Sequence, residues 1–289
     1  MLRRTHWPLL AIFLLTGPSR ASAADPQAKP LATRFRRPIA LATVDNGRQF
    51  LVANRDSGTI SRVDIPARRV LDETHVGKRL ADLVLVPGGD HVLVADAGGR
   101  QLILCRLGNG PPQPSIRIDL PVEPTRLAID RDGRRVAVTS KWARRLVLFD
   151  LPITPSSKPR LLPLPVPGRH LLWLPGTDSV VVADAFGGQL AVVDAAATRV
   201  QFVHRLSGHN IGGLALSPDG RRLIISHQVL NSAARTTNND VFWGLLMTNN
   251  LRRIPTKELL SNDPLPIRRQ SVVMLGQAGH AAGDPSGLS

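Results

Sequence analysis

Two histidines are the side chains of this 289-residue chain best placed to bind a cofactor or transfer a proton. His209 and His227 lie 18 residues apart, with His204 shortly before them. A histidine titrates near neutral pH and can ligate a metal or a haem. No HxH or HExxH spacing supports a metal site, however. The alternative for both residues is structural, with each ring bonded to a nearby loop carbonyl.

Polar residues recur at one position of the repeat described below and could be mistaken for a catalytic set. They follow the second strand of each copy and are Asn54, Asp96, Ser140, Asp184 and His227. Asn, Asp and Ser at such positions bond to the backbone of the next turn. We therefore predict turn caps here.

Motifs that encode a specific chemistry are absent from the sequence. It contains no Cys-x-x-Cys-His haem attachment site, no Gly-rich phosphate loop and no Gly-x-Ser-x-Gly elbow. The single cysteine, Cys105, alternates with Leu102 and Leu104 and is predicted to be a buried small hydrophobe. We therefore expect no catalytic residue, no cofactor and no metal in this chain alone.

A repeat of 42 to 44 residues determines the fold class. Each copy begins with an apolar strand led by Leu, turns at a Gly and continues through a second, third and fourth short strand. The strand leaders are Leu41, Leu83, Leu127, Leu171 and Leu214. Four strands at this period are typical of a β-propeller blade. The sequence therefore predicts an all-β protein with five four-stranded blades in residues 38–275.

The fifth copy departs from the repeat. Its second strand ends at Ser226, but no third strand is recognised at the expected distance, and the next clear strand is that of Val272. We predict an insertion at about 228–266, and long insertions in compact repeats are often functional. Its residues Asn239, Asp240, Phe242, Trp243 and Met247 form a possible interaction surface. Alternatively, Phe242, Trp243 and Met247 are the insertion's own small core.

The N-terminal residues predict export. Arg3 and Arg4 precede an apolar stretch from Trp7 to Thr16, and Ala21-Ser-Ala23 offers a cleavage site. This pattern is typical of a secretory signal peptide over 1–23, followed by a linker over 24–37. The apolar stretch is too short to span a membrane, and no other segment approaches the required length. A periplasmic or cell-surface location is expected, with no transmembrane segment.

The C-terminal residues 276–289 predict either the start of a sixth blade or a disordered tail. Gly283 to Leu288 resembles the start of blade five, so Leu288 would be a sixth strand leader. Five-bladed rings are uncommon among propellers of about 4 to 8 blades. We therefore expect these five blades to belong to an incomplete ring of seven or eight.

The charge is strongly basic, with a formal net charge of +15. The arginines are distributed as pairs through every blade, and no Tyr is available for base stacking. We predict that the protein binds no nucleic acid and that most of these arginines are solvated. The alternative is attraction to an acidic partner or an anionic envelope surface.

The first copy resembles a known repeat. Leu51-Val-Ala-Asn54 and Thr59-Ile-Ser-Arg-Val-Asp64 resemble the YVTN-type propeller repeat, which occurs in surface proteins, lactonase-like enzymes and haem domains. The stretches from His227 and from Asn239 to Met247 are similar to exported bacterial proteins in which such a propeller precedes a c-type cytochrome or cytochrome c peroxidase-like domain. The resemblance implies a protein partner or a missing C-terminal domain that contains haem.

Two functional hypotheses follow. In the first, the chain is a non-catalytic exported propeller that serves as a binding or scaffold module, as a fragment of a periplasmic electron-transfer protein. In the second, it is a lactonase-like hydrolase or a cofactor-dependent oxidoreductase that uses the central channel. The first is favoured, because the repeats supply no converging acids or histidines beyond the turn caps.

Overall fold

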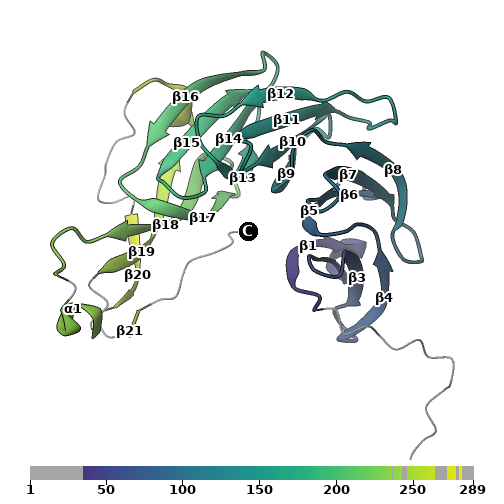
Figure 1. Ribbon diagram of the computed structural model, residues 1–289, viewed down its shortest axis with the longest axis horizontal. Helices are drawn as coiled ribbons and strands as arrows, with labels where there is room; N and C mark the ends of the chain where they lie inside the picture. Colours follow the sequence, from purple (N-terminus) through teal and green to yellow (C-terminus); the bar gives the residue numbers. More distant parts are fainter. Residues whose placement is uncertain (1–34, 236, 243–245, 264–271, 278–279, 282–289) are drawn as a thin grey trace, which may run out of the picture. The chain divides into compact units, whose positions relative to one another are not determined.

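The fold is all-β and contains five antiparallel blades (Figure 1). The computed structural model describes residues 35–235, 237–242, 246–263, 272–277 and 280–281. Each blade is a meander in which consecutive strands pair as neighbours. The predicted propeller of four-stranded blades is therefore confirmed. No helix among these described residues is long and apolar enough to cross a membrane.

The strands follow the predicted order in all five blades. Blade one contains β1 (Pro38–Val44), β2 (Gln49–Asn54), β3 (Thr59–Asp64) and β4 (Arg69–His75). Blade two contains β5 (Leu80–Leu85), β6 (His91–Asp96), β7 (Gln101–Arg106) and β8 (Gln113–Asp119). Blade three contains β9 (Arg126–Ile129), β10 (Arg135–Ser140), β11 (Arg145–Asp150) and β12 (Arg160–Pro163). Blade four contains β13 (Gly168–Trp173), β14 (Ser179–Asp184), β15 (Gln189–Asp194) and β16 (Arg199–Arg205).

Blade five contains β17 (His209–Leu216), β18 (Arg222–Leu230), β19 (Met247–Pro255) and β20 (Val272–Gln277). The two-residue strand β21 (His280–Ala281) pairs with the end of β20. Within the described residues, three short helical segments accompany the blades, namely η1 (Asp45–Gly47), α1 (Asn238–Phe242) and η2 (Thr256–Leu260).

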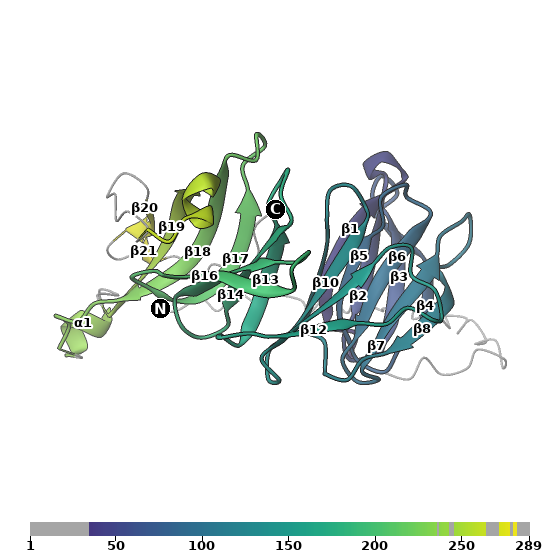
Figure 2. The same ribbon diagram turned by 90° about the horizontal axis from the view of Figure 1, so that it is seen from above.

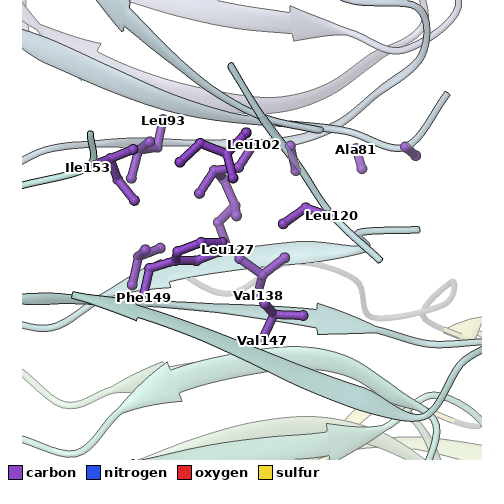
Figure 3. Packing of buried hydrophobic residues seen from close by; sticks show 13 residues of the cluster. Ala81, Leu93, Leu102, Leu120, Leu127, Val138, Val147, Phe149 and Ile153 are labelled. Atoms are coloured by element: carbon purple, nitrogen blue, oxygen red, sulfur yellow. The ribbon is translucent and has the colours of Figure 1, made fainter. Parts of the chain in front are cut away.

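Neighbouring blades share hydrophobic cores to which the strand leaders contribute. Leu127 of blade three packs in one cluster with Leu93 and Leu102 of blade two (Figure 3). Leu83 lies likewise in a cluster with Leu51 and Ile60 of blade one. Each leader therefore packs towards the preceding blade, where apolar burial stabilises the fold by about 25 cal/mol per Å².

Leu41 is the exception among the strand leaders. Its side chain is 62% exposed, whereas Leu83 and Leu127 are 6% and 7% exposed. Blade one is the first blade of the described chain, so no earlier blade supplies apolar side chains against Leu41. No blade in the described part of the chain therefore covers the flank of blade one that carries Leu41.

The third strand of blade five lies inside the predicted insertion. β19 pairs with β18 along its whole length, from Arg222 opposite Pro255 to Leu230 opposite Met247. β18 and β19 have nine residues each, against six in β14 and β15. In both ribbon views, α1 lies beyond the ends of these two strands (Figures 1 and 2). The irregularity is therefore a lengthened hairpin followed by η2.

The segment after the lengthened hairpin packs onto blade four. Leu259 of η2 is fully buried, and its carbonyl oxygen lies 3.0 Å from Nε2 of His204 in β16. The buried Leu259 joins the cluster of Leu190 and Ile211 at the interface of blades four and five. This part of the insertion therefore has a structural role.

We predict that Cys105 does not react with thiol reagents while the protein is folded. The side chain is fully buried, as the sequence predicted, and burial raises the pKa of its thiol to about 12. The thiolate is the reactive form. Burial therefore protects Cys105 twice, because it blocks the reagent's access to the sulfur and keeps the thiol protonated. Titration with Ellman's reagent should modify no thiol in buffer and one thiol per chain in guanidinium chloride. Rapid modification in buffer would contradict this placement.

We predict that Phe149→Ala destabilises the protein by about 3–5 kcal/mol, because it leaves a cavity between blades two and three. Phe149 is 1% exposed and packs in the cluster of Leu127 and Val138 (Figure 3). Chemical denaturation is the measurement. The control Leu161→Ala removes a side chain that is 41% exposed, and it should change the free energy of unfolding by about 0.5 kcal/mol or less. Equal effects would show that the interblade cluster is not a packed core.

Candidate functional site

One position of the first strand is equivalent in all five blades. It directly precedes the strand leader and pairs with the small residue near the end of the second strand. Its side chain is small or absent in blades one and five, and ionisable in blades two to four. The residues are Ala40, Asp82, Arg126, His170 and Gly213, opposite Ala53, Ala95, Thr139, Ala183 and Ser226.

A cavity of about 380 Å³ lies at this position, and we call it the axial cavity. Its lining comes from the innermost strands of all five blades, with Ile39 of β1, Asp82 of β5, Arg126 and Leu127 of β9, Arg169 to Leu171 of β13 and Gly212 to Leu214 of β17. A volume of this size suits a small molecule. The ends of the innermost strands therefore form a polar pocket with charged groups.

Asp82 is held on the wall of the axial cavity by its neighbours. Its carboxylate accepts hydrogen bonds from the backbone N–H groups of Leu83 (3.0 Å) and Leu127 (2.8 Å). Nη1 of Arg126 lies 3.3 Å from Oδ1. Burial raises the pKa of Asp82, although Arg126 and the two N–H groups oppose that rise. The carboxylate thus fixes Arg126 and links blades two and three.

His170 presents a neutral ring beside these charges. Its pKa is lowered to about 4, mainly by burial, and the nearby cations Arg126 and Arg169 contribute to the same shift. Its Nε2 atom is buried and has no hydrogen-bond partner among the described residues. A general base must lie within hydrogen-bond reach of the group it activates. His170 and Asp82 therefore do not form an acid–base pair in this arrangement.

Arg169 begins a chain of polar contacts that leads into blade five. Its Nη1 lies 3.4 Å from Oδ1 of Asn210, whose Nδ2 donates to Oε1 of Gln228 at 2.9 Å. Nε2 of Gln228 in turn donates to Oδ1 of Asn249 at 3.1 Å. Asn210 adopts a positive φ of 47°, which Asn tolerates better than most residues. The chain of contacts connects the axial cavity to the lengthened hairpin.

The loops that connect the second and third strands lie at the same end of the blades as the axial cavity. We call this end the loop face. Trp142 and Phe186 occupy equivalent positions in these connections, two residues after Ser140 and Asp184. They are 69% and 55% exposed, with ring centroids 5.9 Å apart. Nζ of Lys141 lies 4.3 Å from the centroid of Trp142. A cation and two exposed aromatic rings therefore form one patch.

A larger cavity of about 790 Å³ lies at the opposite ends of the innermost strands. Arg135 on its wall pairs with Asp178 (2.6 Å) and Asp130 (3.2 Å), and its guanidinium lies 4.9 Å from the ring centroid of Trp173. Nε1 of Trp173 donates to the carbonyl oxygen of Ala128 at 3.0 Å. These contacts join blades three and four, so we assign them a structural role.

The two histidines singled out from the sequence lie near each other in blade five. His227 is fully buried, with Nδ1 3.3 Å from the carbonyl oxygen of Gln228 and Nε2 3.4 Å from Nε of Arg252. A Cβ on Gly208 would lie 2.4 Å from Nδ1, so only glycine fits against this ring. Burial lowers the pKa of His227, and Arg252 and His209 lower it as well. Both ring nitrogens of His227 thus face protein atoms.

The predicted insertion surface is described in part. Asn239 and Asp240 belong to α1, and Oδ2 of Asp240 accepts a hydrogen bond from the backbone N–H of Arg235 at 2.8 Å. Phe242 ends α1, and Met247 begins β19 with a side chain that is 37% exposed. Trp243 lies outside the described residues. The interaction surface predicted at these positions stays a prediction.

The predicted turn caps are confirmed at two of the five positions. Asp96 accepts hydrogen bonds from the backbone N–H groups of Lys78, Arg79 and Gly98 at 2.9 to 3.0 Å. Asp184 accepts one from Phe186 at 3.0 Å. Ser140 differs, because its hydroxyl is buried and has no partner among the described residues. These carboxylates stabilise loops and are not part of the axial cavity.

The charged axial residues were missed by sequence reasoning, although a signal was present. Asp82, Arg126 and His170 each precede a strand leader, so the repeat itself aligns them. Because the residue type at this position differs from copy to copy, a search for recurring residue types does not detect it. Among the described residues, no three His, Cys, Asp or Glu side chains are grouped so that they could hold a metal ion.

Comparison with known proteins supports the fold. No protein-family model matches this chain, and no curated protein matches it in sequence. The solved structure of Kuenenia stuttgartiensis hydrazine synthase is similar with a TM-score of 0.73 at 18% identity, over 91% of this chain and 73% of that chain. The β-propeller domain of Myceliophteria thermophila Cps50 (Swd1) gives 0.54 at 16% identity, over 70% and 69%. At these identities the likeness establishes the fold and not an activity.

We predict that His170 makes the protein less stable in acid. Its pKa is about 4 in the folded state and about 6.5 in an unfolded chain, so the unfolded state binds the proton first as the pH falls. The stability contributed above pH 6.5 is therefore lost as the pH falls to 4, by up to about 3 kcal/mol.

Denaturation of the wild type and His170→Gln between pH 8 and pH 4 measures this effect. At pH 8 the ring is neutral in both states, so the difference there gives the cost of the substitution apart from titration. The variant should lose less stability than the wild type on acidification. Parallel curves over this range would contradict the assigned environment of His170.

Proposed function

We propose that this chain is a non-catalytic, exported β-propeller that binds a protein partner through its loop face. The observation that carries the proposal is the patch of Lys141, Trp142 and Phe186, in which two large aromatic side chains are exposed at equivalent loop positions. Aromatic and cationic residues are enriched at the centres of protein interfaces. The ring–ring and ring–cation contacts also hold the patch in one conformation, which lowers the entropy lost on binding.

The charge of the loop face supports an acidic partner. Arg37, Arg55 and Arg79 lie near one another there: the pKa of Arg55 is lowered mainly by burial and also by the other two cations, while Asp56 and Glu123 act in the opposite direction. Glu123 pairs with Arg79 at 3.1 Å but does not reverse this balance. Excess positive charge at an interface accelerates association with an acidic surface. We therefore favour a protein whose contacting surface is acidic.

The partner is proposed to be a further part of the same exported protein or a separate periplasmic protein. The exposed Leu41 supports the incomplete ring, because further blades against blade one would bury it as Leu83 and Leu127 are buried. The resemblance to exported propellers that precede a c-type cytochrome supports a haem-containing domain as that partner. Export itself rests on the signal peptide predicted over 1–23.

The second candidate function is an enzyme that uses the central channel, and Asp82 and His170 on the wall of the axial cavity favour it. Against it, Asp82 is bonded to two backbone N–H groups and Arg126, and Nε2 of His170 has no partner among the described residues. A hydrolase requires a nucleophile and a base within hydrogen-bond reach of each other. The binding module is therefore the better supported function.

We predict that a photo-crosslinking residue at position 142 captures an acidic protein in the envelope of the native host. The control places the same residue at position 161 on β12, where Leu161 is also exposed. The captured protein is then purified and its affinity for the wild-type chain is measured. Trp142→Ala and Phe186→Ala should each weaken binding by about tenfold or more, and Leu161→Ala should not. Equal capture at both positions, or unchanged affinity in the aromatic variants, would overturn the proposal.

A further inference from the structure

Arg126 and Arg169 line the axial cavity, and other protein groups satisfy their guanidinium groups only in part. Among the described residues, Arg126 makes one ion pair with Asp82, at 3.3 Å, and Arg169 makes one contact with the neutral amide of Asn210, at 3.4 Å. Each guanidinium has five N–H donors. Both contacts are long for hydrogen bonds to a guanidinium, so most of the donors remain available for a ligand.

The electrostatic balance of the cavity favours an anion of low charge. Two cations face one carboxylate, and that carboxylate already accepts hydrogen bonds from the backbone of Leu83 and Leu127. His170 adds no charge near neutral pH, because its pKa is about 4. The remaining positive charge suits a carboxylate, whereas Asp82 opposes the larger charge of a phosphate.

The glycines of the fifth blade leave space for a ligand in the axial cavity. The position that carries Asp82, Arg126 and His170 in blades two to four is occupied by Gly213, which follows Gly212. Without these side chains the cavity remains open to about 380 Å³. The apolar lining of Ile39, Leu127 and Leu171 suits the carbon skeleton of an organic ligand.

We propose that the axial cavity binds a small organic carboxylate, whose oxygens accept hydrogen bonds from Arg126 and Arg169. Asp82 positions the Arg126 guanidinium, and Asn210 positions that of Arg169. The site is distinct from the aromatic patch of the loop face, so it does not depend on the proposed partner. The carboxylate is either a free metabolite or an acidic side chain or C-terminus of a bound peptide.

Calorimetric titration of the purified chain at fixed ionic strength tests this site, with acetate, succinate and inorganic phosphate as probes. We expect saturable binding of acetate or succinate that is tighter than binding of phosphate. Arg169→Gln and Arg126→Lys should each weaken it by about tenfold, as expected for loss of a charge-assisted contact. Arg69→Gln, which removes an exposed arginine of β4, should leave the affinity unchanged.

Two results would overturn the proposal: no saturable binding of either carboxylate, or equal weakening by Arg69→Gln and Arg169→Gln. Tighter binding of phosphate would overturn the assignment of the ligand class. Arg169→Gln does not remove a partner of Asp82, so a circular dichroism spectrum and melting temperature like the wild type's are expected and would show that it folds.

A tetrapeptide with an acidic C-terminal residue distinguishes the two sources of the carboxylate. A free metabolite as the ligand predicts that succinate binds more tightly than the peptide and that Trp142→Ala does not affect succinate binding. A peptide source predicts the reverse order and a loss of peptide binding in Arg169→Gln. Failure of partner capture at position 142 would leave the succinate result intact, so the two proposals can fail separately.

Discussion

The fold depends on the burial of one blade's apolar side chains against the next blade. A single blade exposes both faces of its sheet, and a four-stranded sheet is not stable until such a face is covered. The strand leaders Leu83 and Leu127 achieve this by packing towards the preceding blade, and both are almost fully buried. The same requirement makes Leu41 informative, because an identical residue in an identical strand position is exposed where the described blades provide no neighbour.

This packing also determines where the charged residues lie. Side chains alternate between the two faces of a strand, so the residue before each leader points away from the interblade core that the leader enters. In blades two to four that residue is Asp82, Arg126 or His170, and all three line the axial cavity. Burying a carboxylate there is costly, and the two backbone N–H groups and the arginine that bond to Asp82 offset the cost. The repeat therefore supplies an apolar interface and a polar axis from adjacent residues.

The sequence predicted the regular part of the fold because fixed turns make strand spacing constant. The third strands β3, β7, β11 and β15 end at Asp64, Arg106, Asp150 and Asp194, at a constant spacing from the small residues Ala53, Ala95, Thr139 and Ala183. It did not reveal β19, whose residues Asn249, Asn250 and Arg252 are polar yet buried, so the strand lacks apolar alternation. β19 forms a strand because it pairs with β18, and the pattern of apolar residues within β19 itself does not encode that pairing. The axial site was missed because its members share a position and not a residue type.

The open side of the axial cavity and the lengthened hairpin of β18 and β19 are physically connected. Gly212 and Gly213 leave the axial cavity open at blade five, and in the same blade Asn210 and Gln228 relay contacts from Arg169 to Asn249 on β19. Displacing a member of this chain removes one hydrogen bond from its neighbour, a contribution of about 0.5–1.5 kcal/mol. The lengthened hairpin therefore helps to hold Arg169 in place. The blade that departs from the repeat in length also departs from it at the axis, and its strands β17 and β18 supply the two middle members of the contact chain, Asn210 and Gln228.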